Sequence, residues 1–174
     1  MGLLFELQNK EIKNTFKAPE KVVVPKNYVS IFLAGSIEMN KAKEWQKEFT
    51  ETLHSTFKNL IVVNPRRDDW DSSWTQELFN KNFYEQVDWE HKHITTTDIV
   101  FIYFQKETKS PISLMELGLV ADTDRKVIVL CEEGFWRKGN VDYICKTYPS
   151  ITQVESFDEA IKEITKMNQV KKND

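Results

Sequence analysis

Short apolar runs alternate along the chain with longer stretches of helical periodicity. The apolar runs cover residues 29–34, 60–63, 98–104, 126–131 and 151–154. Strands that are apolar on almost every residue belong to sheets buried on both faces, and parallel strands need a long crossover between them, usually a helix. The alternation therefore predicts one α/β domain, with a parallel sheet flanked by helices on both faces.

The helical stretches and the chain ends complete this arrangement. Between residues 39 and 57, apolar side chains recur at three- and four-residue spacing, as on one face of a helix. Further helices are predicted over residues 76–95, 111–121, 141–146 and 157–167. The predicted domain of residues 29–168 is preceded by an extension, residues 1–28, which packs on it and holds a short edge strand at residues 21–25; residues 169–174 are predicted to fray.

Charge and cysteine usage exclude several classes of function. The net charge is −3, so no broad basic field is available to hold a nucleic-acid polymer. No apolar run approaches the ~20 residues of a membrane span, and the first residues lack the pattern of a signal peptide. Cys131 and Cys145 form no CxxC motif, and only three histidines are present, which argues against a structural zinc site. We expect a protein of the reducing cytoplasm without a bound metal.

Three loops follow the carboxyl ends of predicted strands, where open α/β sheets bind their ligands. The first contains Gly35 and Ser36, a turn in which glycine lets the backbone approach a phosphate or a sugar. The alternative is a tight turn with Ser36 as a helix N-cap. No glycine-rich phosphate motif accompanies the pair, and Glu38 places a negative charge where a phosphate would sit.

The second loop, residues 64–74, is unusually dense in functional groups. Its first eight residues contain two arginines, three aspartates and a tryptophan. Arginine can fork to a carboxylate, a phosphate or a base carbonyl, and a tryptophan ring can stack on a base. The alternative is a solvated charged loop that is closed by internal ion pairs. The candidate substrate-binding residues of this loop are Asn64, Arg66, Arg67, Asp69, Trp70, Asp71 and Trp74.

A tryptophan and an acid stand side by side in the helix before the third predicted strand. Gln86 and Glu90 share one face of that helix, so both can point into a crevice. The alternative places Trp89 in the core and Glu90 on the surface.

The third loop leads to Glu116, a carboxylate among apolar neighbours. Ser110 is the expected N-cap of the helix, Pro111 its first residue, and Ser113 lies one turn before Glu116. Lone acids are rarely buried without a partner or a task. A partly desolvated carboxylate near a helix N-terminus suits the capture of an oxocarbenium-like sugar carbon, so Glu116 is predicted to be a nucleophile. The alternative is an acid held in a salt bridge at the sheet edge.

Five segments together resemble the nucleoside 2-deoxyribosyltransferase-like superfamily. They are IFLAGSIE at 31–38, NPRRDDWD at 64–71, QVDWE at 86–90, SPISLMELG at 110–118 and GFWRKGNV at 134–141. The resemblance implies a flavodoxin-like fold and cleavage of the N-glycosidic bond of deoxynucleosides or nucleotides. It also implies that Glu116 is the nucleophile and that Glu90, or less well Asp88, binds the sugar. The turn at Gly35 and Ser36 would handle the sugar or a 5′-phosphate.

The resemblance implies no metal or cofactor, and a homo-oligomer in which a neighbouring subunit completes each site. Residues 134–137 are the candidate inter-subunit or lid segment, unless their aromatic side chains simply pack on the surface.

The sequence departs from the family pattern at two places. Ser110 stands where many transferases carry an aspartate near the base, so Asp69 and Asp71 become the candidates for assisting its departure. Glu38 stands where phosphate-cleaving relatives carry a basic residue. The predicted reaction is transfer of deoxyribose between nucleobases. The alternatives are a hydrolytic N-glycosidase acting on a nucleoside 5′-monophosphate or a modified nucleotide, and a non-catalytic nucleotide-binding module.

Overall fold

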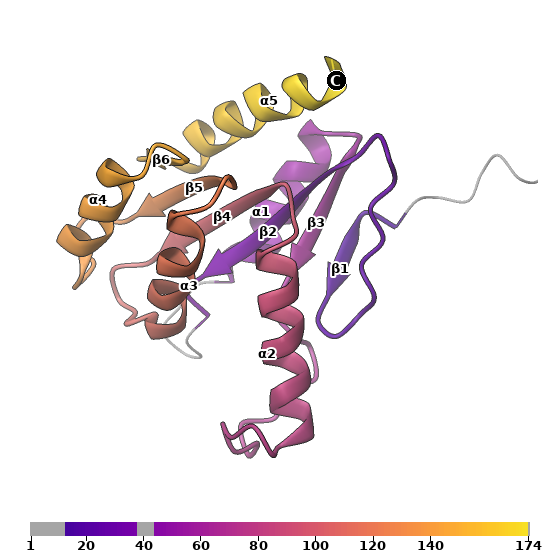
Figure 1. Ribbon diagram of the computed structural model, residues 1–174, viewed down its shortest axis with the longest axis vertical. Helices are drawn as coiled ribbons and strands as arrows, with labels where there is room; N and C mark the ends of the chain where they lie inside the picture. Colours follow the sequence, from indigo (N-terminus) through magenta and orange to yellow (C-terminus); the bar gives the residue numbers. More distant parts are fainter. Residues whose placement is uncertain (1–12, 38–43, 174) are drawn as a thin grey trace, which may run out of the picture.

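A computed structural model describes residues 13–37 and 44–173 of the protein. These residues form a six-stranded sheet in the order β1-β3-β2-β4-β5-β6, and all neighbouring strands are parallel (Figure 1). The strands are β1 (Thr15–Lys17), β2 (Val29–Gly35), β3 (Leu60–Asn64), β4 (Ile99–Phe104), β5 (Lys126–Cys131) and β6 (Ile151–Val154). The helices are α1 (Trp45–Thr56), α2 (Lys81–Ile94), α3 (Pro111–Ala121), α4 (Lys138–Thr147) and α5 (Phe157–Asn173). The predicted flavodoxin-like α/β fold is confirmed.

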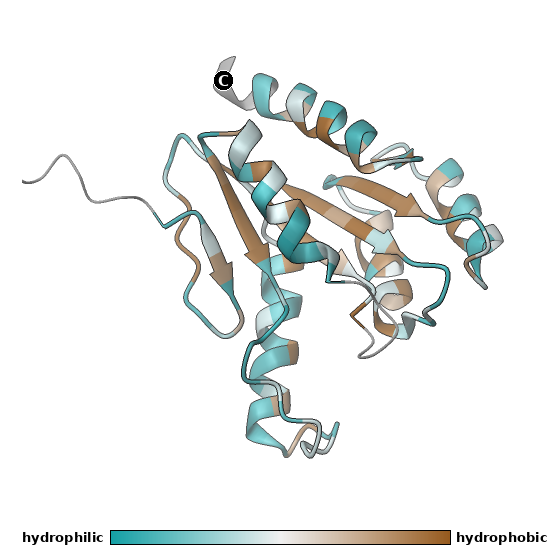
Figure 2. Cartoon of the chain, turned by 180° about the vertical axis from the view of Figure 1, so that it is seen from behind, coloured by the Kyte–Doolittle hydropathy of each residue, from teal (hydrophilic) through white to brown (hydrophobic). Residues whose placement is uncertain are grey.

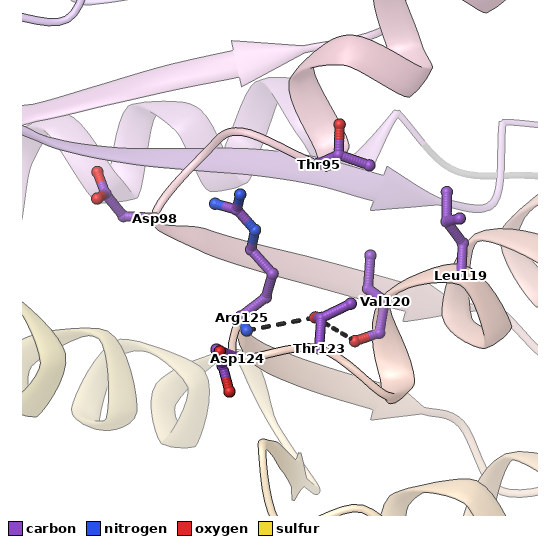
Figure 3. Close-up of a pocket in the computed structure, with 7 residues that line it drawn as sticks. All are labelled: Thr95, Asp98, Leu119, Val120, Thr123, Asp124 and Arg125. Atoms are coloured by element: carbon purple, nitrogen blue, oxygen red, sulfur yellow. Dashed lines mark hydrogen bonds between the residues drawn. The ribbon is translucent and has the colours of Figure 1, made fainter.

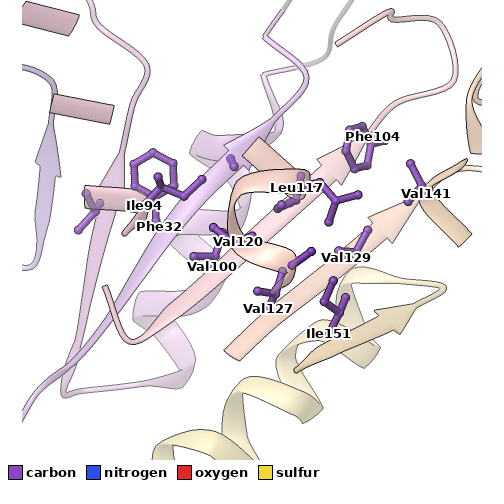
Figure 4. Packing of buried hydrophobic residues seen from close by; sticks show 14 of the residues in the cluster. Phe32, Ile94, Val100, Phe104, Leu117, Val120, Val127, Val129, Val141 and Ile151 are labelled. Atoms are coloured by element: carbon purple, nitrogen blue, oxygen red, sulfur yellow. The ribbon is translucent and has the colours of Figure 1, made fainter. Parts of the chain in front are cut away.

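The helices cover both faces of the sheet and enclose two apolar clusters. On one face, α2, α3 and α4 pack on the strands; Figure 4 shows Leu117 and Val120 of α3 lying against Val100 and Val127. On the other face, α1 and α5 enclose a second cluster, in which Trp45 lies 5.7 Å from Phe101 between ring centroids. Figure 2 shows the strands as apolar bands beneath helices that carry hydrophilic surfaces. Within the described part of the chain, no helix has the length and apolar character that a membrane span requires.

The sheet order places a topological switch beside β2. The chain passes from β2 to β3 on one side, and then returns to β4 on the other side of β2. Helices α1 and α3, which follow β2 and β4, therefore lie on opposite faces of the sheet, and such folds form their ligand crevice at the carboxyl edge of the sheet, at the ends of two strands of this kind. The loop after β3 and the first half of α2 project beyond this edge (Figure 1).

Several element boundaries differ from the sequence prediction. The edge strand predicted at residues 21–25 is wrong: β1 is formed instead by residues 15–17, and Thr15 and Lys17 pair with Val62 and Asn64. Because β1 occupies the edge of β3, residues 21–25 run as irregular chain with Val23 and Val24 exposed.

The helix limits also differ at several ends. Helix α2 begins at Lys81 rather than at residue 76, because the Asn80 side chain accepts hydrogen bonds from the backbone N–H groups of Asn82 and Phe83. Helix α5 continues to Asn173, through most of the tail that was predicted to fray. Residues 39–43 of the first predicted helix lie outside the described residues, as does Glu38.

Candidate active site

The turn after β2 is built around a close approach of two strands. Gly35 has a φ of +137°, and a Cβ atom there would lie 2.4 Å from the carbonyl oxygen of Tyr103 and 2.8 Å from its nitrogen. Both atoms belong to the backbone of β4 and cannot move aside. Glycine is therefore required at this position for the packing of β2 on β4, whatever ligand the turn contacts.

Three hydroxyl groups tie the loop after β2 to the loop after β4. The Ser36 Oγ lies 2.8 Å from the Thr108 Oγ1 and 2.7 Å from the Ser110 Oγ, and it accepts a hydrogen bond from the Gln105 backbone N–H. All three hydroxyl-bearing residues are buried. The structure thus brings the predicted site residues Ser36 and Ser110 together, but their hydroxyls hold the two loops to each other. The sequence analysis did not predict Thr108 as a site residue. The one sequence signal for it is its position two residues before Ser110.

Helix α3 begins as predicted with Ser110 as N-cap and Pro111 as its first residue. Ser110 adopts a left-handed backbone, with φ of 45° and ψ of 51°, and its side chain makes no capping hydrogen bond. Left-handed backbone is rare for a residue other than glycine, asparagine or aspartate. The hydroxyl cluster holds this conformation and thereby sets where α3 starts.

Glu116 lies on the second turn of α3 and is largely enclosed. Burial is the main reason that its pKa rises to about 8; the charge of Glu90 raises it further, and a hydrogen bond from Ser113 opposes the rise. No ion pair involves Glu116 among the described residues. Within the described ranges, the carboxylate therefore has no salt bridge of the kind that the alternative interpretation required.

Glu90 approaches Glu116 from the neighbouring helix α2. The Gln86 Nε2 donates to the Glu90 Oε1 at 2.7 Å and to the Pro65 carbonyl oxygen at 2.8 Å. Burial raises the pKa of Glu90, and the bond from Gln86 counteracts that rise. Helices α2 and α3 thus bring together two desolvated carboxylates that repel each other, an arrangement typical of functional sites.

The arginines of the loop after β3 are bound within the protein. The Arg67 guanidinium is almost fully buried, donates to both carboxylate oxygens of Asp69 at 2.8 and 3.0 Å, and reaches Glu85 on α2 at 3.1 Å. Its carbon Cζ also lies 5.1 Å from the Trp74 ring centroid. The Arg66 Nη2 lies 2.6 Å from the Glu44 Oε1. The Arg67–Asp69 pair matches the alternative of internal ion pairs, whereas Glu85 joins the loop to α2 and Glu44 joins it to the start of α1.

The other candidate residues of this loop have mainly local contacts. The Asn64 Oδ1 accepts from the backbone N–H of Arg66, and the Asp71 Oδ1 accepts from that of Ser73. The rings of Trp70 and Trp74 meet edge to face, with centroids 5.2 Å apart. Trp70 keeps 37% of its surface exposed and is the more exposed tryptophan of this pair.

Trp89 belongs to the core beside the site. Its ring packs against Phe32 and His93, and its Nε1 donates to the Glu20 carbonyl oxygen at 2.7 Å. Trp89, a candidate for substrate binding, thus takes the core position that the alternative gave it, whereas Glu90 is not a surface residue but faces α3.

A pocket of about 510 Å³ lies at the opposite, amino-terminal edge of the strands (Figure 3). Its polar groups serve the fold: the Asp98 Oδ2 accepts from the N–H and hydroxyl of Ser30, and the Arg125 Nη1 donates to the Thr97 carbonyl oxygen. Glu90 and Glu116 do not line it. Among the described residues, no cluster of three or more histidines, cysteines and acids could hold a metal ion.

Fold and site together define a flavodoxin-like α/β protein with two neighbouring carboxylates near the carboxyl edge of its sheet. The family model described as "Nucleoside 2-deoxyribosyltransferase like" matches residues 28–135, more than half of the chain. The chain therefore belongs to the nucleoside 2-deoxyribosyltransferase-like family.

Two further comparisons concern curated proteins and solved structures. No curated protein matches the chain. Among solved structures, the crystal structure of a conserved protein from Enterococcus faecalis V583 resembles it with a TM-score of 0.55 and 13% identity, covering 80% of this chain and 98% of that one. At this identity the similarity supports the fold alone.

Proposed function

We propose that the protein cleaves the N-glycosidic bond of 2′-deoxynucleosides and transfers the deoxyribose to another nucleobase. The observation that carries the proposal is the position of Glu116: a desolvated carboxylate without an ion pair among the described residues, hydrogen-bonded by Ser113 and next to Glu90. In a chain of this family, such a group is suited to react with a sugar carbon.

Glu116 acts in its ionised form. One of its oxygens forms a bond to C1′ while the C1′–N bond breaks, and the electron pair of that bond leaves with the base. The departing base takes up a proton from solvent. An acceptor base then attacks C1′ from the vacated side, loses its N–H proton to solvent and releases the Glu116 carboxylate, so the sugar keeps its configuration and no net proton is consumed. Glu90 accepts a hydrogen bond from a sugar hydroxyl, and Trp70 stacks on the base.

The charge distribution favours a nucleoside over its 5′-phosphate. Arg67 is buried in its pairs with Asp69 and Glu85, and Arg66 pairs with Glu44. Gripping a phosphate would require these pairs to be broken. Hydrogen bonds from Arg67 and from Ser73 hold the pKa values of Asp69 and Asp71 below their usual range. Neither aspartate is therefore suited to deliver a proton to the leaving base at neutral pH.

The enzyme acts as a homo-oligomer in which α3 packs on α3 of a second copy. The outward face of α3 carries Ile112, Met115 and Leu119 at helical spacing, with exposed fractions of 55%, 66% and 43%. An antiparallel pair of these helices sets the exposed Lys109 before α3 against the exposed Asp122 after α3 of the partner. This packing closes the side of the site on which Ile112 neighbours Glu116.

The test supplies deoxyadenosine and cytosine and follows the products by liquid chromatography. Wild-type protein is expected to form deoxycytidine, and Glu116→Ala to lose at least about a thousandfold in rate, because a group that forms the covalent intermediate is removed. Glu163→Gln, which changes an acid that pairs with Lys166 on α5, serves as the control and keeps the wild-type rate.

Each other outcome rejects part of the proposal. A near-wild-type rate of Glu116→Ala excludes Glu116 as nucleophile. Free deoxyribose without deoxycytidine identifies a hydrolase, and faster release of base from deoxyadenosine 5′-monophosphate identifies a nucleotide N-glycosidase. Thermal stabilisation by nucleosides without any base release identifies a binding module.

A further inference from the structure

The amide of Gln86 has an environment that structural packing alone does not explain. Gln86 is 5% exposed, and its Nε2 donates to two acceptors, the Pro65 carbonyl and the Glu90 carboxylate. Because both partners are acceptors, the amide orientation is set, and its Oε1 points the other way. That oxygen is buried and has no hydrogen-bond partner among the described residues.

An unpaired buried oxygen carries an energetic cost. Leaving a buried acceptor without a donor costs about 1–3 kcal/mol, and an apolar side chain of similar volume would avoid that cost. The chain instead places an amide here, and one of its two N–H bonds goes to Glu90. We therefore expect the amide to serve the Glu90 carboxylate that it contacts.

Pro65 and Glu90 define what the amide does. Pro65 directly follows Asn64 at the end of β3, so its carbonyl is a rigid anchor at the carboxyl edge of the sheet. The anchored N–H group then holds one oxygen of Glu90, so the carboxylate cannot rotate freely on its side chain. Burial disfavours the ionised form of a carboxylic acid, and a hydrogen bond donated to the carboxylate favours that form.

We propose that Gln86 is a positioning residue, which uses the Pro65 carbonyl as its anchor to fix the Glu90 carboxylate in the orientation in which it faces the sugar between α2 and α3. The proposal deepens the function proposed above and rests on it in one respect: Glu90 is there the acceptor for a sugar hydroxyl. A substrate that lacks this hydroxyl would not benefit from Gln86.

The charged groups around the pair determine the direction of the expected effect. Glu116 is the charge that faces Glu90 from α3, whereas Arg67, Asp69 and Glu85 on the other side pair with one another. Without the Gln86 bond, the pKa of Glu90 rises. Glu90 then stays neutral to a higher pH and repels a charge on Glu116 less, so the pKa of Glu116 falls.

The first measurement does not depend on turnover. The side-chain carboxyls of glutamate are labelled with carbon-13, and the pair is titrated by NMR in wild type and in Gln86→Met, which keeps the volume and removes the amide. We expect the titration midpoints of Glu90 and Glu116 to move in opposite directions, with the melting temperature kept within a few degrees. Gln153→Met is the matched control, because Gln153, on the distant strand β6, also donates to a carboxylate, that of Asp142 on α4.

The second measurement uses the transfer reaction. Gln86→Met is expected to raise KM for deoxyadenosine about tenfold, the effect of losing one well-placed hydrogen bond to a charged group, while Gln153→Met leaves KM unchanged. If Gln86→Met does not fold, Gln86→Glu replaces it; its side chain has the same shape but, when ionised, cannot donate, and it raises both midpoints.

Unchanged midpoints in a folded variant overturn the proposal, as does a variant that only melts earlier. A wild-type protein without turnover rejects the proposed function, but leaves the titration to decide on Gln86.

Discussion

Glu116 loses most of its contact with water on folding and gains no cation in return from the described residues. Its described partners are the Ser113 hydroxyl, which favours the charged form, and Glu90, which opposes it. Folding therefore strengthens the binding of a proton by this carboxyl. The ionised form, which nucleophilic attack requires, is less stable in the folded protein than in water. Since Glu90 raises the pKa of Glu116 through its charge, the titrations of the two carboxyls are coupled.

This residue makes the stability of the protein depend on pH with a defined sign. The folded-state pKa of about 8 exceeds the ordinary 4.5 of the carboxyl, so the folded state binds more protons than the unfolded chain between these values. The contribution of Glu116 to the free energy of unfolding is fully present below about pH 4.5. It is lost as the pH rises toward about 8, and the free energy of unfolding then falls by at most about 1.4 kcal/mol per pH unit. Glu116→Gln abolishes the loss, because the amide does not ionise.

Urea unfolding of both proteins across this pH range checks the expectation. The free energy of unfolding of Glu116→Gln, relative to wild type, should increase from the acid to the alkaline end by several kcal/mol, at most about 5 kcal/mol. A difference that is independent of pH would show that Glu116 titrates in the folded protein as it does in the unfolded chain.

At the scale of elements, the contact between β2 and β4 sets the geometry of the carboxyl edge. Gly35 ends β2 against the backbone of Tyr103, and the hydroxyls of Ser36, Thr108 and Ser110 continue the junction into the two loops. Any shift of β2 on β4 would pass directly to Ser110, and hence to the start of α3. The junction therefore positions Glu116 from a distance.

Gly35→Ala should destabilise the protein by at least about 3 kcal/mol. The added Cβ meets backbone atoms of β4 at 2.4 and 2.8 Å, and alanine is also strained at a φ of +137°. Gly118→Ala is the matched control, because a Cβ added there in α3 would meet no neighbouring atom of the described residues within 4 Å. That change should stabilise the protein by roughly 0.5–1 kcal/mol. Thermal and urea unfolding measure both, and equal effects of the two changes would contradict the close contact.

At the scale of the whole molecule, an apolar face of α3 has no partner among the described residues. Ile112, Met115 and Leu119 are exposed, although the rest of the helix packs on the sheet. The segment of residues 134–137 lies nearby: Phe135 is buried against Phe104, while the Trp136 Nε1 donates to the Lys109 carbonyl oxygen. An assembly through α3 would bury these apolar side chains beside the site.

Met115→Lys is expected to weaken self-association at least about tenfold, because it places a charge at the centre of an apolar contact. Sedimentation velocity over a concentration series measures the dissociation constant. Val23→Lys changes a similarly exposed apolar residue outside the helical layers and should leave association unchanged. A wild-type protein that is monomeric throughout the series, or a Met115→Lys protein that associates normally, would exclude α3 as the interface.

The sequence by itself determined strands β2 to β6, the alternation of strands and helices, and the fold class. The bounds of α3, β5 and β6 agree with those predicted, since each depends on a local signal: an apolar run, or proline at the first helical position. The same local signals placed Glu116 after β4. They failed at residues 21–25, where the edge of β3 was taken by residues 15–17, because strand pairing depends on a partner that is distant in sequence.

Only the tertiary structure decided how the polar residues are used. Arg67 and Asp69 pair within their own loop, Ser36 and Ser110 join two loops, and Glu90 and Glu116 meet across two helices. Residue type and spacing are the same whether such a group faces a ligand or a neighbouring side chain. The difference lies in burial and in distances between segments far apart in the chain, which are set when the helices pack on the sheet.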